Sequence, residues 1–107
     1  MAYTVRFSRS ARRDLSELFR WIARNDAPSK AEMVLDRVEE AAKSIASMPF
    51  RGSRPLELPA GIENVRQVFF KPYRVIYRVS GDEVVIHLIA DGRRNLQALL
   101  LRRLTED

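Results

Sequence analysis

Two arginines and the only histidine of this sequence are spaced so that they can meet on one face of a β-sheet. The segment KPYRVIYRV, residues 71–79, carries Arg74 and Arg78 four residues apart. Because strand side chains alternate between two faces, Arg74 and Arg78 share one face. The opposite face carries the apolar residues Tyr73, Val75, Tyr77 and Val79. Guanidinium groups grip phosphate or carboxylate in bidentate fashion, so the arginine face is a candidate contact surface.

A predicted hairpin brings the histidine to these arginines. Gly81-Asp82, before the segment EVVIHLIA of residues 83–90, suits a two-residue turn with glycine first. The turn predicts the pairs Val79–Val84, Arg78–Val85, Tyr77–Ile86, Ile76–His87 and Arg74–Ile89. His87 then lies between Arg74 and Arg78, where adjacent cations disfavour the imidazolium and favour a neutral, proton-accepting ring. A surface histidine without a chemical role is the alternative interpretation.

Composition limits the class of protein. A chain of 107 residues with 46% hydrophobic residues is long enough for one folded domain. It has no cysteine, and its single histidine leaves a metal site dependent on carboxylates, of which no compact cluster is visible. We therefore expect no metal and no other cofactor. No apolar run reaches the length of a signal peptide core or the ~20 residues of a membrane span, so we expect a cytoplasmic protein.

Positive charge is concentrated in the second half of the chain. The net charge is +5, and only three of the 19 basic residues are lysines. Residues 64–103 hold eight basic and three acidic side chains, so this segment alone carries +5. The charge leaves open a plain nucleic-acid-binding module, but such a module needs exposed stacking aromatics, and only Phe69 qualifies.

The first half of the sequence predicts a strand and two helices. Residues 2–7 (AYTVRF) alternate like a short strand, and residues 8–26 follow as an amphipathic helix. Its apolar stripe is Ala11, Leu15, Leu18 and Ile22, widened by Phe19 and Trp21. A second helix opens at Ser29, with Glu32 three residues on as in a capping box. Its inner face is Ala31, Leu35, Val38, Ala42 and Ile45. The short connection predicts an antiparallel helix hairpin.

The second half predicts three antiparallel strands and a basic terminal helix. After a loop at residues 52–61, strands at 64–70, 73–79 and 83–90 form a meander that completes a small sheet. Residues expected on the arginine face of the first of these strands are Val65, Gln67 and Phe69. Asp91 is placed to cap a helix that starts near Gly92, with Arg93 and Arg94 in its first turn. Its apolar stripe is Leu96, Leu99, Leu100 and Leu104, and Leu101 falls off it. The fold class is α+β, in one domain spanning residues 1–107.

This order of elements and three of its motifs resemble the RelE/ParE superfamily of bacterial toxins from type II toxin–antitoxin pairs. The motifs are FSRSARRDLSELFRWIA, PYRVIYRV followed by a Gly-Asp hairpin, and ADGRRNL. The resemblance covers essentially the whole chain. The terminal segment GRRNLQALLLRRL is more similar to the ParE and plasmid-stabilisation branch than to the RelE branch.

The resemblance implies one of two activities. RelE-like members cut messenger RNA in the ribosomal A site without a metal, and this likeness assigns Arg74 and Arg94 to the phosphate and leaves His87 as general base. The lysines and the helix tyrosine that RelE-like nucleases use are missing here. ParE-like members bind DNA gyrase and trap its cleaved complex, which needs a contact surface instead of a catalytic set. We favour the ParE-like activity, with Arg74, Arg78, Arg93 and Arg94 as target contacts.

Either activity implies a cognate antitoxin that silences the toxin in a hetero-oligomer. Family members use an antitoxin segment that folds onto the toxin as helix and strand, which requires apolar anchors. Trp21 and Leu101 are the candidate antitoxin contacts, because Trp21 flanks the inner stripe of its helix and Leu101 is off the stripe of the last helix. Phe19 is better explained as part of the core.

Overall fold

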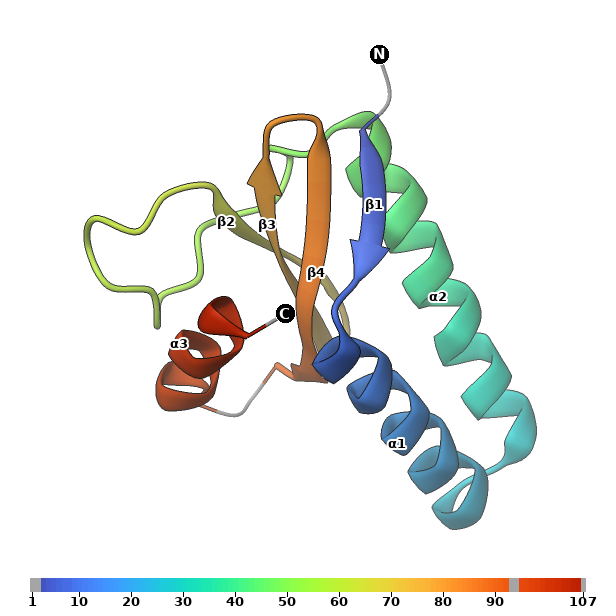
Figure 1. Ribbon diagram of the computed structural model, residues 1–107. Coiled ribbons are helices and arrows are strands. Elements are labelled where there is room, and N and C mark those ends of the chain that lie inside the picture. The colour runs from blue at the N-terminus through green and yellow to red at the C-terminus, as the bar shows by residue number, and fades with distance from the viewer. Residues whose placement is uncertain (1–2, 93–94, 107) are drawn as a thin grey trace.

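The computed structural model describes residues 3–92 and 95–106, which form a four-stranded sheet with three helices (Figure 1). The elements are β1 (Thr4–Phe7), α1 (Arg9–Asn25), α2 (Pro28–Ser47), β2 (Val65–Phe70), β3 (Tyr73–Ser80), β4 (Glu83–Asp91) and α3 (Gln97–Thr105). The strand order is β1-β4-β3-β2. β1 runs parallel to β4, and β2, β3 and β4 form an antiparallel meander. The predicted α+β class and element order are confirmed.

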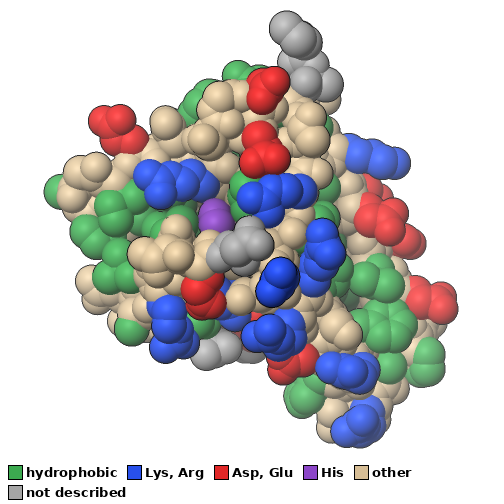
Figure 2. Space-filling model, viewed as in Figure 1, with side chains coloured by type: hydrophobic (Ala, Val, Ile, Leu, Met, Phe, Trp, Pro, Cys, Tyr) green, Lys and Arg blue, Asp and Glu red, His purple; other side chains and the backbone are tan. Residues whose placement is uncertain are grey.

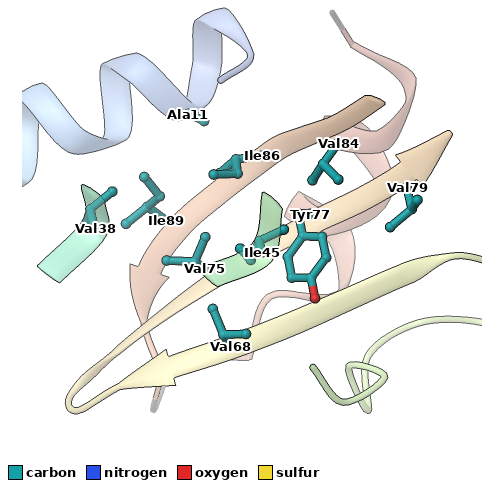
Figure 3. Close-up of a cluster of buried hydrophobic side chains, with 10 residues drawn as sticks. All are labelled: Ala11, Val38, Ile45, Val68, Val75, Tyr77, Val79, Val84, Ile86 and Ile89. Carbon is teal, nitrogen blue, oxygen red and sulfur yellow. The ribbon is translucent and has the colours of Figure 1, made fainter. Parts of the chain in front are cut away.

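The core of the fold lies between the sheet and the hairpin of α1 and α2. The stripes predicted for these helices supply Ala11, Val38 and Ile45, which meet the buried face of β3 and β4 (Figure 3). Tyr77 is completely buried in this core, and its hydroxyl donates a hydrogen bond to the carbonyl of Pro49 at 2.7 Å. The bond fixes the chain just after α2 against the middle of the sheet, since a buried hydroxyl needs a partner.

The opposite face of the sheet is covered, which corrects the prediction of an open arginine face. α3 packs on that face (Figure 1), and a second apolar cluster fills the space between them. Its buried members are Leu58, Val65, Ile76, Leu88, Leu96 and Leu100. The predicted leucine stripe of α3 points into this cluster, and Leu101 is off it as expected. The alternation of residues along the strands did not predict that α3 covers this face. The face is covered because Ile76, Val65 and Leu88 make its centre apolar.

A nearly buried ion pair fastens α3 to α1 and β4. Both guanidinium nitrogens of Arg103 donate to the carboxylate of Asp14 at 2.8 Å, and one of them also donates to the carbonyl of His87 at 3.0 Å. The Asp14 carboxylate accepts a further bond from the backbone N–H of Ile89 at 3.1 Å. Removing either charge would leave the other nearly buried without its counter-charge, which costs about 3–5 kcal/mol in fully buried pairs.

The hairpin register is confirmed near the turn and wrong beyond it. Val79, Arg78 and Tyr77 pair with Val84, Val85 and Ile86 as predicted, but Ile76 pairs with Leu88. β4 therefore bulges by one residue at His87, and Arg74 pairs with Ala90 instead of Ile89. The bulge lets Ile86 and Ile89, three residues apart, both enter the core under the helix hairpin.

Two predicted helix starts are also wrong. α2 begins at Pro28 with Ala27 as N-cap and no side-chain capping bond, so Ser29 and Glu32 form no capping box. Proline suits the first helical position because its φ is already fixed, and it starts the helix before Ser29. α3 begins only at Gln97, because Asp91 still belongs to β4 and the N–H of Gly92 donates to the carbonyl of Pro72 at 2.6 Å. The start of α1 is capped by Ser8, whose hydroxyl accepts from the N–H of Ala11.

We predict that Gly52→Ala destabilises the protein by about 1–3 kcal/mol. Gly52 lies where the loop after α2 pairs with β2, and an added Cβ would stand 2.4 Å from the carbonyl oxygen of Gln67 and 2.9 Å from the hydroxyl of Tyr77. Because the nearer atom is backbone, the loop must move away from the strand. Thermal unfolding followed by circular dichroism measures the loss. Ser53→Ala, one residue on, adds no atom and serves as the control; equal melting temperatures for the two variants would contradict this account.

Candidate functional site

Arg74 is held by a carboxylate beneath the loop that follows α2. Its side chain is 5% exposed, and its two terminal nitrogens donate to the two oxygens of Glu57 at 2.9 and 2.5 Å. One of these nitrogens also donates to the side-chain oxygen of Gln67 at 3.1 Å. The guanidinium therefore already makes the bidentate contact that the sequence predicted it would make with a target.

Glu57 joins three parts of the fold at one point. Its carboxylate also accepts the backbone N–H of Leu96, the N-cap of α3, at 3.3 Å. The hydrogen bonds from Arg74 are the largest cause that lowers the pKa of Glu57 to about 2, against the opposing effect of burial. The carboxylate is consequently ionised at any physiological pH, and it links the loop, β3 and the start of α3.

A pocket of about 490 Å³, with polar and apolar side chains in its lining, adjoins this ion pair. It is lined by Leu56, Glu57, Gln67, Phe69, Arg74, Gly92, Asn95 and Gln97. Leu56 is 98% exposed and Phe69 58% exposed at its border. Gly92 is packed tightly here, because an added Cβ would lie 3.1 Å from both the Arg74 side chain and the carbonyl oxygen of Pro72. The glycine of the ADGRRN segment thus lets the chain pass close to Arg74.

His87 is buried at the bulge of β4, between Val85 and Ala90, the residues that pair with Arg78 and Arg74. Its Nδ1 has no hydrogen-bond partner within residues 3–92 and 95–106. Burial, followed by the charges of Arg6 and Arg78, lowers its pKa, so the ring is neutral at pH 7 as predicted, although burial is the larger cause. In Figure 2 the single histidine lies among basic side chains. A ring that is only 7% exposed is poorly placed to take a proton from a large substrate.

Of the remaining predicted target contacts, Arg78 alone belongs to the described residues. Arg78 is half-buried on β3, and none of the ion pairs found in the described segments involves it. Arg93 and Arg94 lie outside the described residues. Tyr77 is buried, and burial raises the pKa of its hydroxyl, which is bonded to Pro49. Of the residues proposed for RNA cleavage, the two that are described, Arg74 and His87, are therefore both buried.

The predicted antitoxin contacts Trp21 and Leu101 are both exposed. Trp21 is 62% exposed and separates two pockets of about 610 and 280 Å³. The larger lies between α1, β4 and α3, and the smaller lies between the helix hairpin and the β2–β3 turn. Leu101 is 36% exposed on α3 and borders neither of them.

A mostly apolar groove of about 370 Å³ runs on the other side of α1. It is lined by Phe7, Arg12, Leu15, Ser16, Phe19, Arg20 and Leu35. Phe19, expected in the core, is half-buried and forms part of this groove. The exposed side of α1 is basic, with Arg9, Arg12, Arg13, Arg20 and Arg24. α1 therefore offers apolar surface on two sides and positive charge between them.

Within residues 3–92 and 95–106, no three His, Asp or Glu side chains are close enough together to hold a metal ion. In the same segments, no helix combines the length and apolar character needed to span a bilayer.

Comparison with known proteins identifies the family. Residues 5–96 match the family model described as the ParE toxin of type II toxin–antitoxin system, parDE. Toxin ParE3 of Caulobacter vibrioides is 36% identical over 87 residues, which cover 81% of this chain and 84% of that protein.

Solved structures share the fold. The chromosomal ParDE toxin–antitoxin system of P. aeruginosa contains a chain with a TM-score of 0.68 at 22% identity, covering 84% of this chain and 96% of that one. A chain of the toxin–antitoxin complex RelBE2 of Mycobacterium tuberculosis has a TM-score of 0.59 at 29% identity, covering 85% of this chain and 99% of that one. A mutant of E. coli RelE in the free state has a TM-score of 0.66 at 14% identity, covering 95% of this chain and 98% of that one. The family match and the ParE3 relative decide between the branches: this chain belongs to the ParE toxin family of type II toxin–antitoxin systems.

Proposed function

We propose that this ParE-family toxin inhibits growth in the cytoplasm by binding DNA gyrase and trapping its cleaved complex. The main observation behind this proposal is that both terminal nitrogens of the Arg74 guanidinium donate hydrogen bonds to the carboxylate of Glu57. A RelE-like nuclease needs this guanidinium to bind the scissile phosphate, whereas a gyrase poison needs a contact surface and no catalytic residues. Family membership supports the same reading.

RNA cleavage would also require an accessible general base. His87 is the only histidine, and with 93% of its surface covered it has no direct path to a 2′-hydroxyl. We therefore do not propose ribosome-dependent cleavage of messenger RNA as a second function.

The gyrase contact in this proposal uses Arg78 together with Arg93 and Arg94. Arg74 acts as a positioning residue in this proposal, because its ion pair holds the loop of Glu57 and the start of α3. A contact surface of this kind gains affinity from charged side chains that are partly exposed and free to meet a partner.

We further propose that a cognate antitoxin silences the toxin by folding along α1 and α3. Trp21 and Leu101 are its apolar contacts, and the groove of Phe19 offers a second docking surface on α1. The five exposed arginines of α1 favour an acidic antitoxin segment. Solved structures of ParDE and RelBE2 toxin–antitoxin systems contain chains of this fold, which supports an antitoxin as the partner.

Trp21→Ala is expected to weaken antitoxin binding by at least ~2 kcal/mol, the usual threshold of a hot spot. An exposed tryptophan between two pockets can bury its ring only against a partner, so the melting temperature of the toxin alone should change little. Isothermal titration calorimetry with the antitoxin measures the effect. Met48→Ala is the matched control, because Met48 is also 62% exposed but lies beyond the end of α2. Unchanged affinity for Trp21→Ala would exclude Trp21 from the interface.

Arg78→Ala is expected to reduce gyrase poisoning. Loss of one charge-assisted contact should raise the toxin concentration needed for a given amount of cleaved plasmid roughly tenfold, equivalent to ~1.4 kcal/mol. A gyrase cleavage assay measures linearised plasmid for the wild type, Arg78→Ala and the exposed control Arg24→Ala. His87→Gln, which keeps a polar side chain at the bulge, should behave like the wild type. Absence of cleaved plasmid with wild-type toxin, combined with metal-independent cuts in A-site codons that His87→Gln abolishes, would reverse the proposal.

A further inference from the structure

The loop between α2 and β2 holds a leucine almost entirely in solvent. Leu56 is 98% exposed, whereas Pro55 and Leu58 on either side of it are buried. The N–H of Leu58 donates to the carbonyl of Pro55 at 3.2 Å, so these residues form a β-turn in which Leu56 is the second residue. In Figure 1 this loop extends beside α3, to the left of the sheet.

Contacts within and below the loop fix the backbone that carries Leu56. Glu57, the next residue, is tied to β3 and to the start of α3 by its hydrogen bonds with Arg74 and Leu96. On the other side, the guanidinium of Arg54 donates to two carbonyls further along the same loop, both at 2.6 Å. A side chain presented from a fixed backbone loses less conformational freedom when a partner covers it, so Leu56 is pre-organised for contact.

Phe69 is the second exposed apolar residue of the pocket of about 490 Å³ that Leu56 lines. Because Glu57 is ion-paired with Arg74, the two charges in the lining offset each other. The other polar groups of the lining are side-chain amides, those of Gln67, Asn95 and Gln97. A pocket with two apolar side chains, neutral amides and no unpaired charge suits a neutral side chain of a folded protein better than a phosphate.

The position of this pocket favours the toxin's target over the antitoxin. The three other pockets described above border α1, whereas no residue of α1 and neither Trp21 nor Leu101 lines this one. Gly92 and Asn95, which do line it, flank in sequence the two arginines proposed as gyrase contacts.

The charge around the pocket disfavours a second copy of the chain as its occupant. Most of the lining comes from residues 64–103, the segment that carries +5. A symmetric pair would bring two such segments together, and like charges across an interface are repulsive. The surface instead fits a partner that presents an apolar side chain beside acidic residues.

We propose that Leu56 and Phe69 are the apolar anchors by which this toxin binds gyrase. They receive one neutral or apolar side chain of a gyrase surface whose acidic residues face the basic segment 64–103. This inference rests on the proposed gyrase activity and adds the apolar part of the contact, which arginines alone do not supply.

Leu56→Gln tests the first anchor, because it removes apolar surface while keeping the charge and nearly the size of the side chain. The toxin concentration that gives half-maximal linearised plasmid in a gyrase cleavage assay should rise roughly tenfold, equivalent to ~1.4 kcal/mol. The melting temperature should stay that of the wild type, because the side chain is exposed. Phe69→Ala should shift the same concentration in the same direction.

Met48→Gln is the matched control, because Met48 is a 62% exposed apolar residue that lines none of the four pockets. It should keep wild-type potency. Unchanged potency of Leu56→Gln beside an active wild type, or an equal loss in Met48→Gln, would overturn the inference and leave the proposed function standing. Absence of cleaved plasmid with the wild type itself would overturn both.

The other occupants are tested with the same two variants. Calorimetry measures antitoxin affinity, and sedimentation velocity at the assay concentration measures self-association. If Leu56→Gln loses antitoxin affinity or breaks a dimer while gyrase poisoning is unchanged, the pocket belongs to the antitoxin or to a second copy, and the inference is wrong.

Discussion

The ion pair between Arg74 and Glu57 is the interaction on which the second face of the sheet depends. Burying a guanidinium is unfavourable unless its donors are paired. Here the carboxylate of Glu57 accepts hydrogen bonds from both terminal nitrogens of Arg74 and from the N–H of Leu96, the N-cap of α3. The loop, the strand and the terminal helix are therefore placed by one group. Asp14 and Arg103 repeat the arrangement at the other end of α3, so the helix is held by charge at both ends and by leucines between them.

Local patterns in the sequence predicted the order of the elements and the core beneath the helix hairpin. The 3.6-residue stripes of α1 and α3 and one face of β3 are buried as predicted, and the Gly81-Asp82 turn predicted the first three hairpin pairs. Alternation did not predict that Arg74 and Ile76, on the other face of β3, are buried too. The bulge at His87 escaped prediction because alternation assumes an unbroken ladder. The late start of α3 was not predicted, because aspartate is a favoured N-cap residue and Asp91 was expected to begin the helix. The pairing of Asp91 with Tyr73 keeps it in β4 instead.

The candidate site was less predictable because its decisive contacts are long-range. Glu57 is 17 residues from Arg74 in a loop without regular structure, and Asp14 is 89 residues from Arg103. Neither ion pair follows a regular spacing in the sequence, so no sequence pattern indicates it. One signal was present: Glu57 is the only acidic residue in the loop at 52–61, beside an otherwise basic half of the chain. Trp21, by contrast, was predicted to be a partner contact from its residue type and helical position, and its side chain is exposed.

The bond between Asp14 and Arg103 has a consequence for the order in which the chain acquires its structure. It joins the first helix to the last, so most of the polypeptide must be present before it can form, and closing so long a loop is slow and entropically costly. During synthesis the helix hairpin and the sheet can associate while α3 is still missing. Until the last turn emerges, Ile76 and Leu88 remain in contact with water, and the nascent toxin presents an apolar sheet face that the finished protein hides.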